Sequence, residues 1–151
     1  MWPALADRLE EGEAYLTVEK DLQVASINAD GSPHLVTMWF ALMEGDICFW
    51  TYGRSQKIVN LQRDPRVTVL VATGAEYGEL RGVTISGRAQ VIEDRDEVNR
   101  IGETVFEKYW MTIEDDATRE GVRAMGSKRL GVRITPEKVV SWDHTKLGGM
   151  Y

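Results

Sequence analysis

The 151-residue sequence predicts one mainly β domain, residues 1–151, with a few flanking helices. Short segments that alternate apolar and polar residues recur along the chain between Gly, Pro, Asn and Asp turns. In the segment 83–91, Val83, Ile85 and Val91 alternate with polar residues, as in an antiparallel barrel wall with one face in water. No repeat or linker divides the chain, and a domain of this length buries roughly 70% of its unfolded surface.

Helices are predicted between and beside the strands. The apolar residues of 5–16 predict one or two short opening helices, interrupted around Gly12. A short helix ends before Pro65, because the residue before a proline is disfavoured in a helix. An Asp-x-x-Glu capping box followed by an apolar stripe predicts a helix over about 94–110. The polar segment 112–127 predicts at most another short helix.

Two of the predicted strands are apolar on both faces. In the segments 34–43 and 47–51, the residues on both faces are largely apolar. In the second segment, for example, Cys48 lies on one face and Phe49 on the other. The core of a small barrel covers one face only, so the other face needs a second cover. A second copy of the chain is one candidate, and the flanking helices are the other. Strands are predicted over 22–28, 34–43, 47–51, 67–72, 81–92, 130–134 and 136–142.

The composition argues against several classes of protein. A net charge of -6 and a pI near 5.0 argue against binding to nucleic acid or an anionic membrane surface, while leaving room for a local pocket for a small anion. No apolar run approaches the ~20 residues of a membrane span. With one cysteine, Cys48, and two histidines, we expect neither a disulfide framework nor a metal site, and a cytoplasmic location.

The junction after the strand over 47–51 has the residues of a phosphate site. Ser55 is placed to cap the next helix, where free backbone N–H groups and the positive end of the helix dipole meet. The Thr51 hydroxyl and the Lys57 ammonium are close in sequence, and Arg54 adds positive charge. The alternative is an ordinary helix cap beside a solvated lysine.

Several motifs occur together in this chain. They are Asp30-Gly31-Ser32-Pro33, Trp39-Phe40, Phe49-Trp50-Thr51, Ser55, Lys57, Asn60-Leu61-Gln62-Arg63-Asp64-Pro65-Arg66-Val67, and the segments 83–87 and 142–149. This set resembles the flavin and deazaflavin split-barrel family, the superfamily of pyridoxamine 5'-phosphate oxidase. It is most similar to the actinobacterial branch of reductases that use the deazaflavin coenzyme F-420.

The resemblance implies a six-stranded antiparallel split β-barrel that forms a homodimer, with cofactor sites in grooves at the dimer interface. It assigns residues 37–39 to the tricyclic cofactor ring, and Thr51, Ser55 and Lys57 to the cofactor phosphate. The tail over 141–151 is a candidate for reaching the site. No catalytic residue is implied. The full candidate cofactor site is Thr37, Met38, Trp39, Trp50, Thr51, Arg54, Ser55, Lys57 and Asn60.

The function expected from this resemblance is a reductase that transfers a hydride from reduced coenzyme F-420 to a small, planar, unsaturated substrate. The alternatives are an FMN-dependent oxidase of the pyridoxamine phosphate type and a non-catalytic protein that binds a cofactor or haem. Where the FMN oxidases carry an arginine, a second basic residue and a glutamine that grip the flavin, this chain aligns Leu35, Gln56 and Gly82. Each lost cationic donor weakens a phosphate site by about 1.5–3 kcal/mol, which favours the deazaflavin over FMN.

Overall fold

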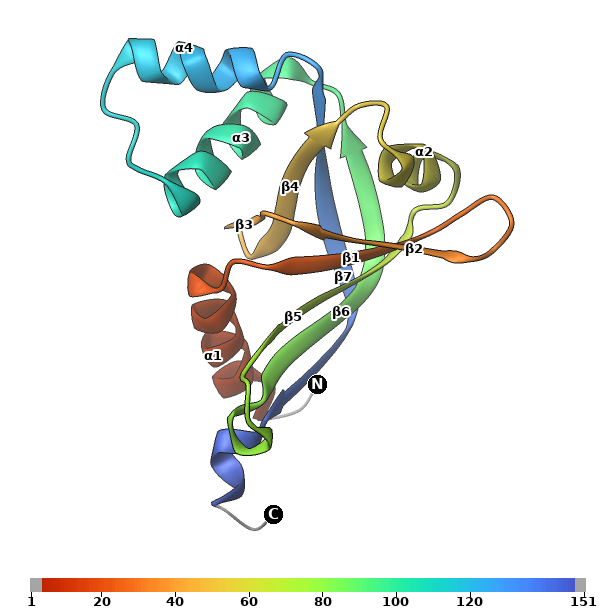
Figure 1. Ribbon diagram of the computed structural model, residues 1–151, viewed down its shortest axis with the longest axis vertical. Coiled ribbons are helices and arrows are strands. Elements are labelled where there is room, and N and C mark those ends of the chain that lie inside the picture. The colour runs from red at the N-terminus through yellow and green to blue at the C-terminus, as the bar shows by residue number, and fades with distance from the viewer. Residues whose placement is uncertain (1–3, 149–151) are drawn as a thin grey trace.

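The computed structural model describes the backbone of residues 4–148 and the side chains of residues 11–148. The strands are β1 (Leu22–Ile27), β2 (Pro33–Met38), β3 (Ala41–Met43), β4 (Asp46–Tyr52), β5 (Arg66–Thr73), β6 (Arg81–Ile92) and β7 (Arg129–Asp143). They form one antiparallel sheet in the order β2-β1-β5-β6-β7-β4-β3 (Figure 1). The predicted mainly β fold with flanking helices is confirmed, with seven strands rather than six.

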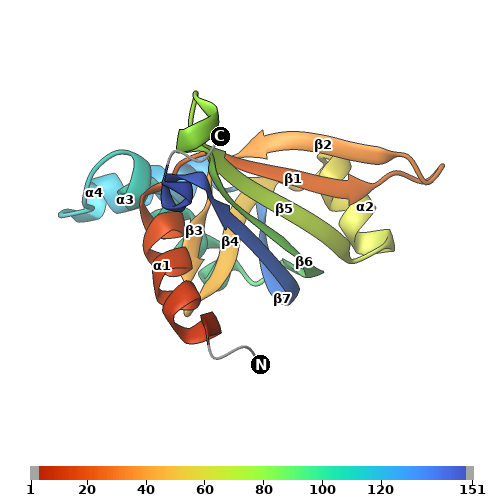
Figure 2. The same ribbon diagram turned by 90° about the horizontal axis from the view of Figure 1, so that it is seen from below.

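The strand predicted over 34–43 is broken in the structure. Trp39 and Phe40 interrupt it, so β2 and β3 are separate strands at the two ends of the sheet order. Because only the two residues 39 and 40 join these edges, the sheet has to curl back on itself, and its curvature is plain in Figure 2. The buried ring of Phe40 lies in the inner core at this corner.

The segments predicted as strands over 130–134 and 136–142 form one strand, β7. It pairs with β6 along its length, with a register shift between Ser86 and Gly87. A side chain at Gly87 would collide with the carbonyl oxygen of Thr135, only 2.0 Å from the position a Cβ would take. The shift therefore needs glycine, and it allows β7 to continue past Pro136 as a single long strand.

The helices lie on separate sides of the curved sheet (Figure 1). They are α1 (Ala4–Val18), α2 (Gln56–Arg63), α3 (Arg95–Tyr109) and α4 (Asp116–Met125), with short 3₁₀ turns at Tyr77–Glu79 and His144–Leu147. Half of the predicted capping box is present at the start of α3: the Asp94 carboxylate accepts a hydrogen bond of 3.0 Å from the Glu97 N–H, whereas the Glu97 carboxylate accepts from Arg100. The predicted interruption at Gly12 is wrong: α1 runs through it without a break. Within residues 4–148, no helix is long and apolar enough to cross a membrane.

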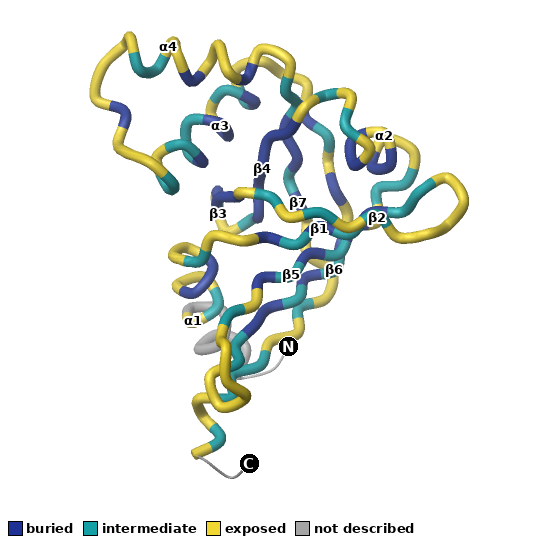
Figure 3. Tube along the Cα trace, viewed as in Figure 1, coloured by how far each residue is buried: buried dark blue, intermediate teal, exposed yellow. Residues whose placement is uncertain are grey.

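Apolar side chains form two cores, one on each side of β4. Figure 3 shows β4 buried along most of its length. The inner core fills the curl of the sheet and includes Val24, Phe49 and Val69. The outer core packs Cys48 and Trp50 against α3 and α4. The second face of 47–51 is therefore covered by helices of the same chain rather than by a second copy. On β2, by contrast, the outward side chain of Leu35 is 66% exposed.

The Trp50 ring fits between two glycines, Gly102 on α3 and Gly126 after α4. A Cβ at either glycine would lie 2.2 or 2.1 Å from the ring, well inside contact distance. We expect Gly102→Ala to lower the free energy of unfolding by about 1–3 kcal/mol in urea denaturation, because an overpacked core has to shift. Gly12→Ala, with open space around it in α1, is the matched control and should stabilise by up to about 1 kcal/mol. Equal effects of the two variants would contradict this packing.

Candidate cofactor site

A buried lysine lies where β4 meets α2. Lys57 is only 8% exposed, and its Nζ donates a hydrogen bond of 3.0 Å to Oγ1 of Thr51, which is also buried. Burial lowers the pKa of the Lys57 ammonium below its usual value, and no carboxylate offsets that effect. Among the described side chains, none forms an ion pair with Lys57. The site therefore holds a positive charge that lacks its counter-charge.

Ser55 sits at the N-cap of α2 without capping it. Its N–H donates to the Tyr52 carbonyl oxygen at 2.9 Å, which closes the turn between β4 and α2. Its side chain accepts no hydrogen bond from the helix, and its Oγ is buried without a partner. The first N–H groups of α2 therefore lack the usual side-chain cap. Such an end, with a free hydroxyl beside it, is suited to an anion.

Asn60 holds α2 against the sheet. The fully buried side chain donates from Nδ2 to Ser26 Oγ at 3.1 Å and to Asn28 Oδ1 at 3.0 Å, both on or just after β1. Its Oδ1 accepts from Gln56 Nε2 at 2.8 Å. Its hydrogen-bonding groups are thus used within the chain. Asn60, predicted as a cofactor contact, is positioned to fix the helix that carries Lys57.

Two adjoining cavities open beside this cluster. One, of about 480 Å³, contains Met38 and Thr51 from the predicted site, and the other, of about 370 Å³, contains Arg54. The larger one is lined by Met38, Thr51, Tyr52, Met125, Ser127, Lys128 and Arg129, and the smaller by Tyr52, Arg54 and Lys128. These linings include three cations and no carboxylate, which is unusual in a chain of net charge -6.

Lys128 and Arg129 were not singled out from the sequence. They follow α4 and begin β7, where Arg129 pairs with Tyr52 at the end of β4. That register brings residues about 77 positions apart in sequence into one wall. Neither cation belongs to a motif, so only the strand pairing could have identified them.

Other predicted contacts lie elsewhere. Trp50 is 7% exposed and packed in the outer core, with the Arg129 guanidinium 4.7 Å from its ring centroid. Thr37 points outward from β2 and donates to Gln23 Oε1 at 2.7 Å. Trp39 is absent from the lining of both cavities and stacks on Tyr109 instead. Of the predicted residues, Met38, Thr51 and Arg54 therefore line the two cavities. Lys57 is bonded to Thr51 behind this lining, and Ser55 follows Arg54 with its hydroxyl buried.

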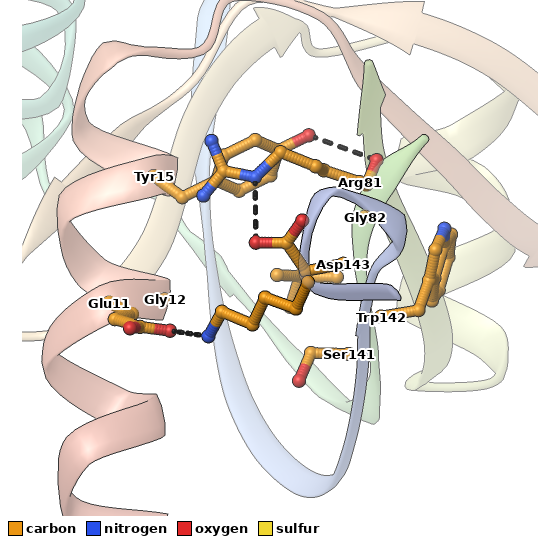
Figure 4. A pocket seen from close by; sticks show the side chains of 10 residues that line it. Glu11, Gly12, Tyr15, Arg81, Gly82, Ser141, Trp142 and Asp143 are labelled. Atoms are coloured by element: carbon orange, nitrogen blue, oxygen red, sulfur yellow. Dashed lines mark hydrogen bonds and ion pairs between the residues drawn. The ribbon is translucent and has the colours of Figure 1, made fainter. Parts of the chain in front are cut away.

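A third cavity, of about 280 Å³, lies at the opposite end of the sheet between α1 and the end of β7 (Figure 4). Its charges are paired with one another: Arg81 Nε lies 3.3 Å from Asp143, and Lys146 Nζ lies 2.6 Å from Glu11. The tail over 141–148 borders this cavity, so within one copy it lies far from α2 (Figure 1). The last residues of the predicted tail, 149–151, are outside the described part of the chain.

A family model described as pyridoxamine 5'-phosphate oxidase matches residues 9–143. The chain belongs to this family. The family includes oxidoreductases and proteins that bind flavins such as FMN. No curated protein matches the chain.

Among solved structures, a conserved hypothetical protein from Mycobacterium tuberculosis, Rv2991, is 39% identical, with a TM-score of 0.89 over 94% of this chain and 88% of that one. A protein described as an F-420 reductase is 18% identical, with a TM-score of 0.65 over 85% of this chain and 94% of its own. The heme storage protein HutZ from Vibrio cholerae is 16% identical, with a TM-score of 0.68 over 89% and 92% of the two chains. The last two similarities show a shared fold only.

The unbalanced charge of Lys57 predicts a measurable effect on stability. Because the pKa of Lys57 is lower in the folded protein than its unfolded value of 10.5, the unfolded state binds more protons as the pH approaches 10.5, and stability rises with pH in that window. Without ligand, Lys57→Met should unfold at a higher urea concentration than wild type at neutral pH, with an advantage that narrows towards pH 10.5. The exposed Lys138→Met is the charge control. Lower stability of Lys57→Met at every pH would mean that the lysine is structural.

Proposed function

We propose that the protein binds coenzyme F-420 in the cavities beside Lys57 and acts as a reductase on a small, planar, unsaturated substrate. The observation that carries this proposal is the buried Lys57 ammonium with no carboxylate beside it. A protein maintains a buried charge of this kind at a cost in stability, and a bound anion offsets that cost. A cofactor phosphate is the anion that the family would supply.

The residues at the site fit such a cofactor. Lys57, the Thr51 hydroxyl and the free Ser55 hydroxyl provide donors for a phosphate at the start of α2. Met38 gives the larger cavity an apolar wall against which a planar ring can lie. When bound, the reduced deazaflavin supplies the hydride, and the chain binds, orients and shields it from water.

The cations of the two cavities favour the deazaflavin over FMN. Arg54, Lys128 and Arg129 line space next to the phosphate donors, and none of these three is in an ion pair among the side chains that the structure describes. FMN ends in one phosphate, whereas coenzyme F-420 continues from its phosphodiester into a chain of glutamates. A row of cations beyond the phosphate donors suits the longer anionic chain.

The three positions whose side chains bind flavin in FMN oxidases provide no comparable hydrogen-bond donor in this chain. Leu35 points outward from β2 and is 66% exposed. Gln56 donates its amide N–H to Asn60. Gly82 lies at the opposite end of the sheet, and a Cβ there would be 2.2 Å from the Trp142 ring. This arrangement supports coenzyme F-420 as the cofactor.

Calorimetric titration with coenzyme F-420, FMN and hemin tests the proposal. We expect coenzyme F-420 to bind most tightly, and Lys57→Met to weaken its binding by roughly 10- to 150-fold, the value of a charge-assisted hydrogen bond of about 1.5–3 kcal/mol. The matched control, Lys138→Met, should leave binding unchanged. Tighter binding of FMN, or a stoichiometric yellow flavin that copurifies, would replace this proposal with the oxidase. Tighter binding of hemin without turnover would favour a haem-binding protein.

We also propose that the protein is a homodimer. Outward side chains on β2, β1, β5, β6 and β7 form a sheet surface whose centre is uncharged, although 28% of the chain is charged. Lys138, opposite Ser86, and the pair Arg66 and Arg88 lie at one edge of it. Leu35 and Val140 on this surface are 66% and 45% exposed. A second copy with the same surface is self-complementary, as a two-fold dimer requires. The uncharged centre of the surface consists of Leu35, Thr37, Gln23, Ala25, Thr68, Leu70, Thr84, Ser86 and Val140.

Sedimentation velocity at micromolar concentration checks the dimer. We expect wild type to sediment as a dimer and Leu35→Glu to shift it to monomer, because two buried carboxylates would face each other across the two-fold axis or lose water without a partner. Val18→Glu introduces the same charge at a 66% exposed position outside this surface and should leave the dimer intact. A wild-type protein that stays monomeric would refute the assembly.

A further inference from the structure

A cluster of aromatic rings surrounds the C-terminal end of α3. Trp39 stacks on Tyr109 with ring centroids 4.4 Å apart and 12° between the ring planes. Trp110 stands nearly perpendicular to Trp39, at 5.4 Å and 83°. Phe106 meets Trp110 edge-on at 4.8 Å. Trp39 and Trp110 together form two sides of a right angle, which we call the aromatic corner.

The backing of this corner is rigid. The Tyr109 hydroxyl donates a hydrogen bond of 2.6 Å to the Lys20 carbonyl oxygen and accepts one of 3.1 Å from the Phe40 N–H. These bonds join the end of α3 to the segments before β1 and before β3. The ring on which Trp39 lies is therefore fixed from two directions, and Trp39 itself has a preset orientation.

The open side of the corner meets solvent. Trp39 is 43% exposed, Trp110 is 54% exposed, and the neighbouring Met111 is 61% exposed. Contiguous exposed apolar surface of this kind marks a binding site more often than a surface without function. Aromatic rings prefer to contact other rings either stacked or edge to face, and the corner offers both arrangements to a single bound ligand. A flat ring system can stack on one tryptophan and meet the other at right angles.

The aromatic corner and the cofactor cavity are formed by adjacent residues that face different sides. Met38 lines the cavity that contains Thr51, whereas Trp39, the next residue, is turned to the end of α3 and is absent from that lining. Successive residues at the end of a strand point to opposite sides, which explains the division. The chain thus places an apolar cofactor wall and an aromatic surface back to back at residues 38 and 39.

We propose that the aromatic corner binds a planar fused-ring molecule, and that Trp39 and Trp110 select the substrate by its flatness. In this arrangement Trp39 contacts the substrate rather than the cofactor ring to which the family resemblance assigned it. The identification of the ligand as the substrate rests on the proposed reductase function. The binding site itself rests on the ring geometry.

Calorimetry without cofactor tests the corner, with 2-naphthol as the planar probe and trans-2-decalol, its saturated and puckered counterpart, as the ligand control. We expect 2-naphthol to bind at least about tenfold more tightly than the decalol. Trp39→Leu and Trp110→Leu should each weaken 2-naphthol binding by roughly 3- to 10-fold. Trp142→Leu makes the same change at the opposite end of the sheet and should have no effect. Coenzyme F-420 should bind Trp39→Leu as it binds wild type.

Other outcomes overturn the proposal. Weaker binding of coenzyme F-420 to Trp39→Leu, with 2-naphthol unaffected, would return Trp39 to the cofactor site. Failure of 2-naphthol to bind, with loss of the dimer in both Trp39→Leu and Trp110→Leu by sedimentation, would mean that a second copy covers the corner. Corner-dependent binding of 2-naphthol in a protein that does not bind coenzyme F-420 would support the binding site and contradict the proposed function instead.

Discussion

The burial of Lys57 without a carboxylate partner is the constraint on which the rest of the site depends. An ammonium loses most of its hydration on burial, and one hydrogen bond to Thr51 replaces only part of it. A carboxylate beside it would remove the cost and also remove the affinity for an anion. The structure instead leaves the charge unbalanced next to the free Ser55 hydroxyl and an uncapped helix end. A bound phosphate would balance all three features together.

The fold keeps this arrangement in place through contacts that are distant in sequence. The break at residues 39 and 40 lets the sheet curl, so that β2 and β4 end near the same cavity. Asn60 ties α2 to β1 through its hydrogen bonds to Ser26 and Asn28, which stops the helix from moving to solvate Lys57. On the other side of β4, the glycines that accept Trp50 let α3 and α4 approach closely and cover it.

The sequence predicts interactions between neighbouring residues better than it predicts where strands break or which distant segments meet. The Asp94 cap and the proximity of Thr51 to Lys57 depend on neighbouring residues, and both hold in the structure. Ser55 occupies the predicted N-cap position, but its side chain does not cap the helix. The break at Trp39 was missed because both faces of 34–43 are apolar, so the alternation gave no sign of a corner.

Residues with large side chains were the hardest to place from the sequence. Trp50 looked like a site residue, yet the space beside two distant glycines draws its ring into the outer core. Lys128 and Arg129 reach the cavity only through the pairing of β7 with β4. Strand register and glycine contacts between distant segments decide these positions, and a single sequence does not encode them in any local pattern.

The most direct test of the account is the pKa of Lys57 itself, measured by NMR on protein in which lysine side chains carry isotope labels, with Lys57→Met used to assign the signal. Without ligand, the pKa of Lys57 should lie below its ordinary value of 10.5. Saturation with coenzyme F-420 should raise it, because a phosphate beside the ammonium favours the charged form. A Lys57 pKa that does not change on saturation would contradict the claim that this lysine holds the cofactor phosphate.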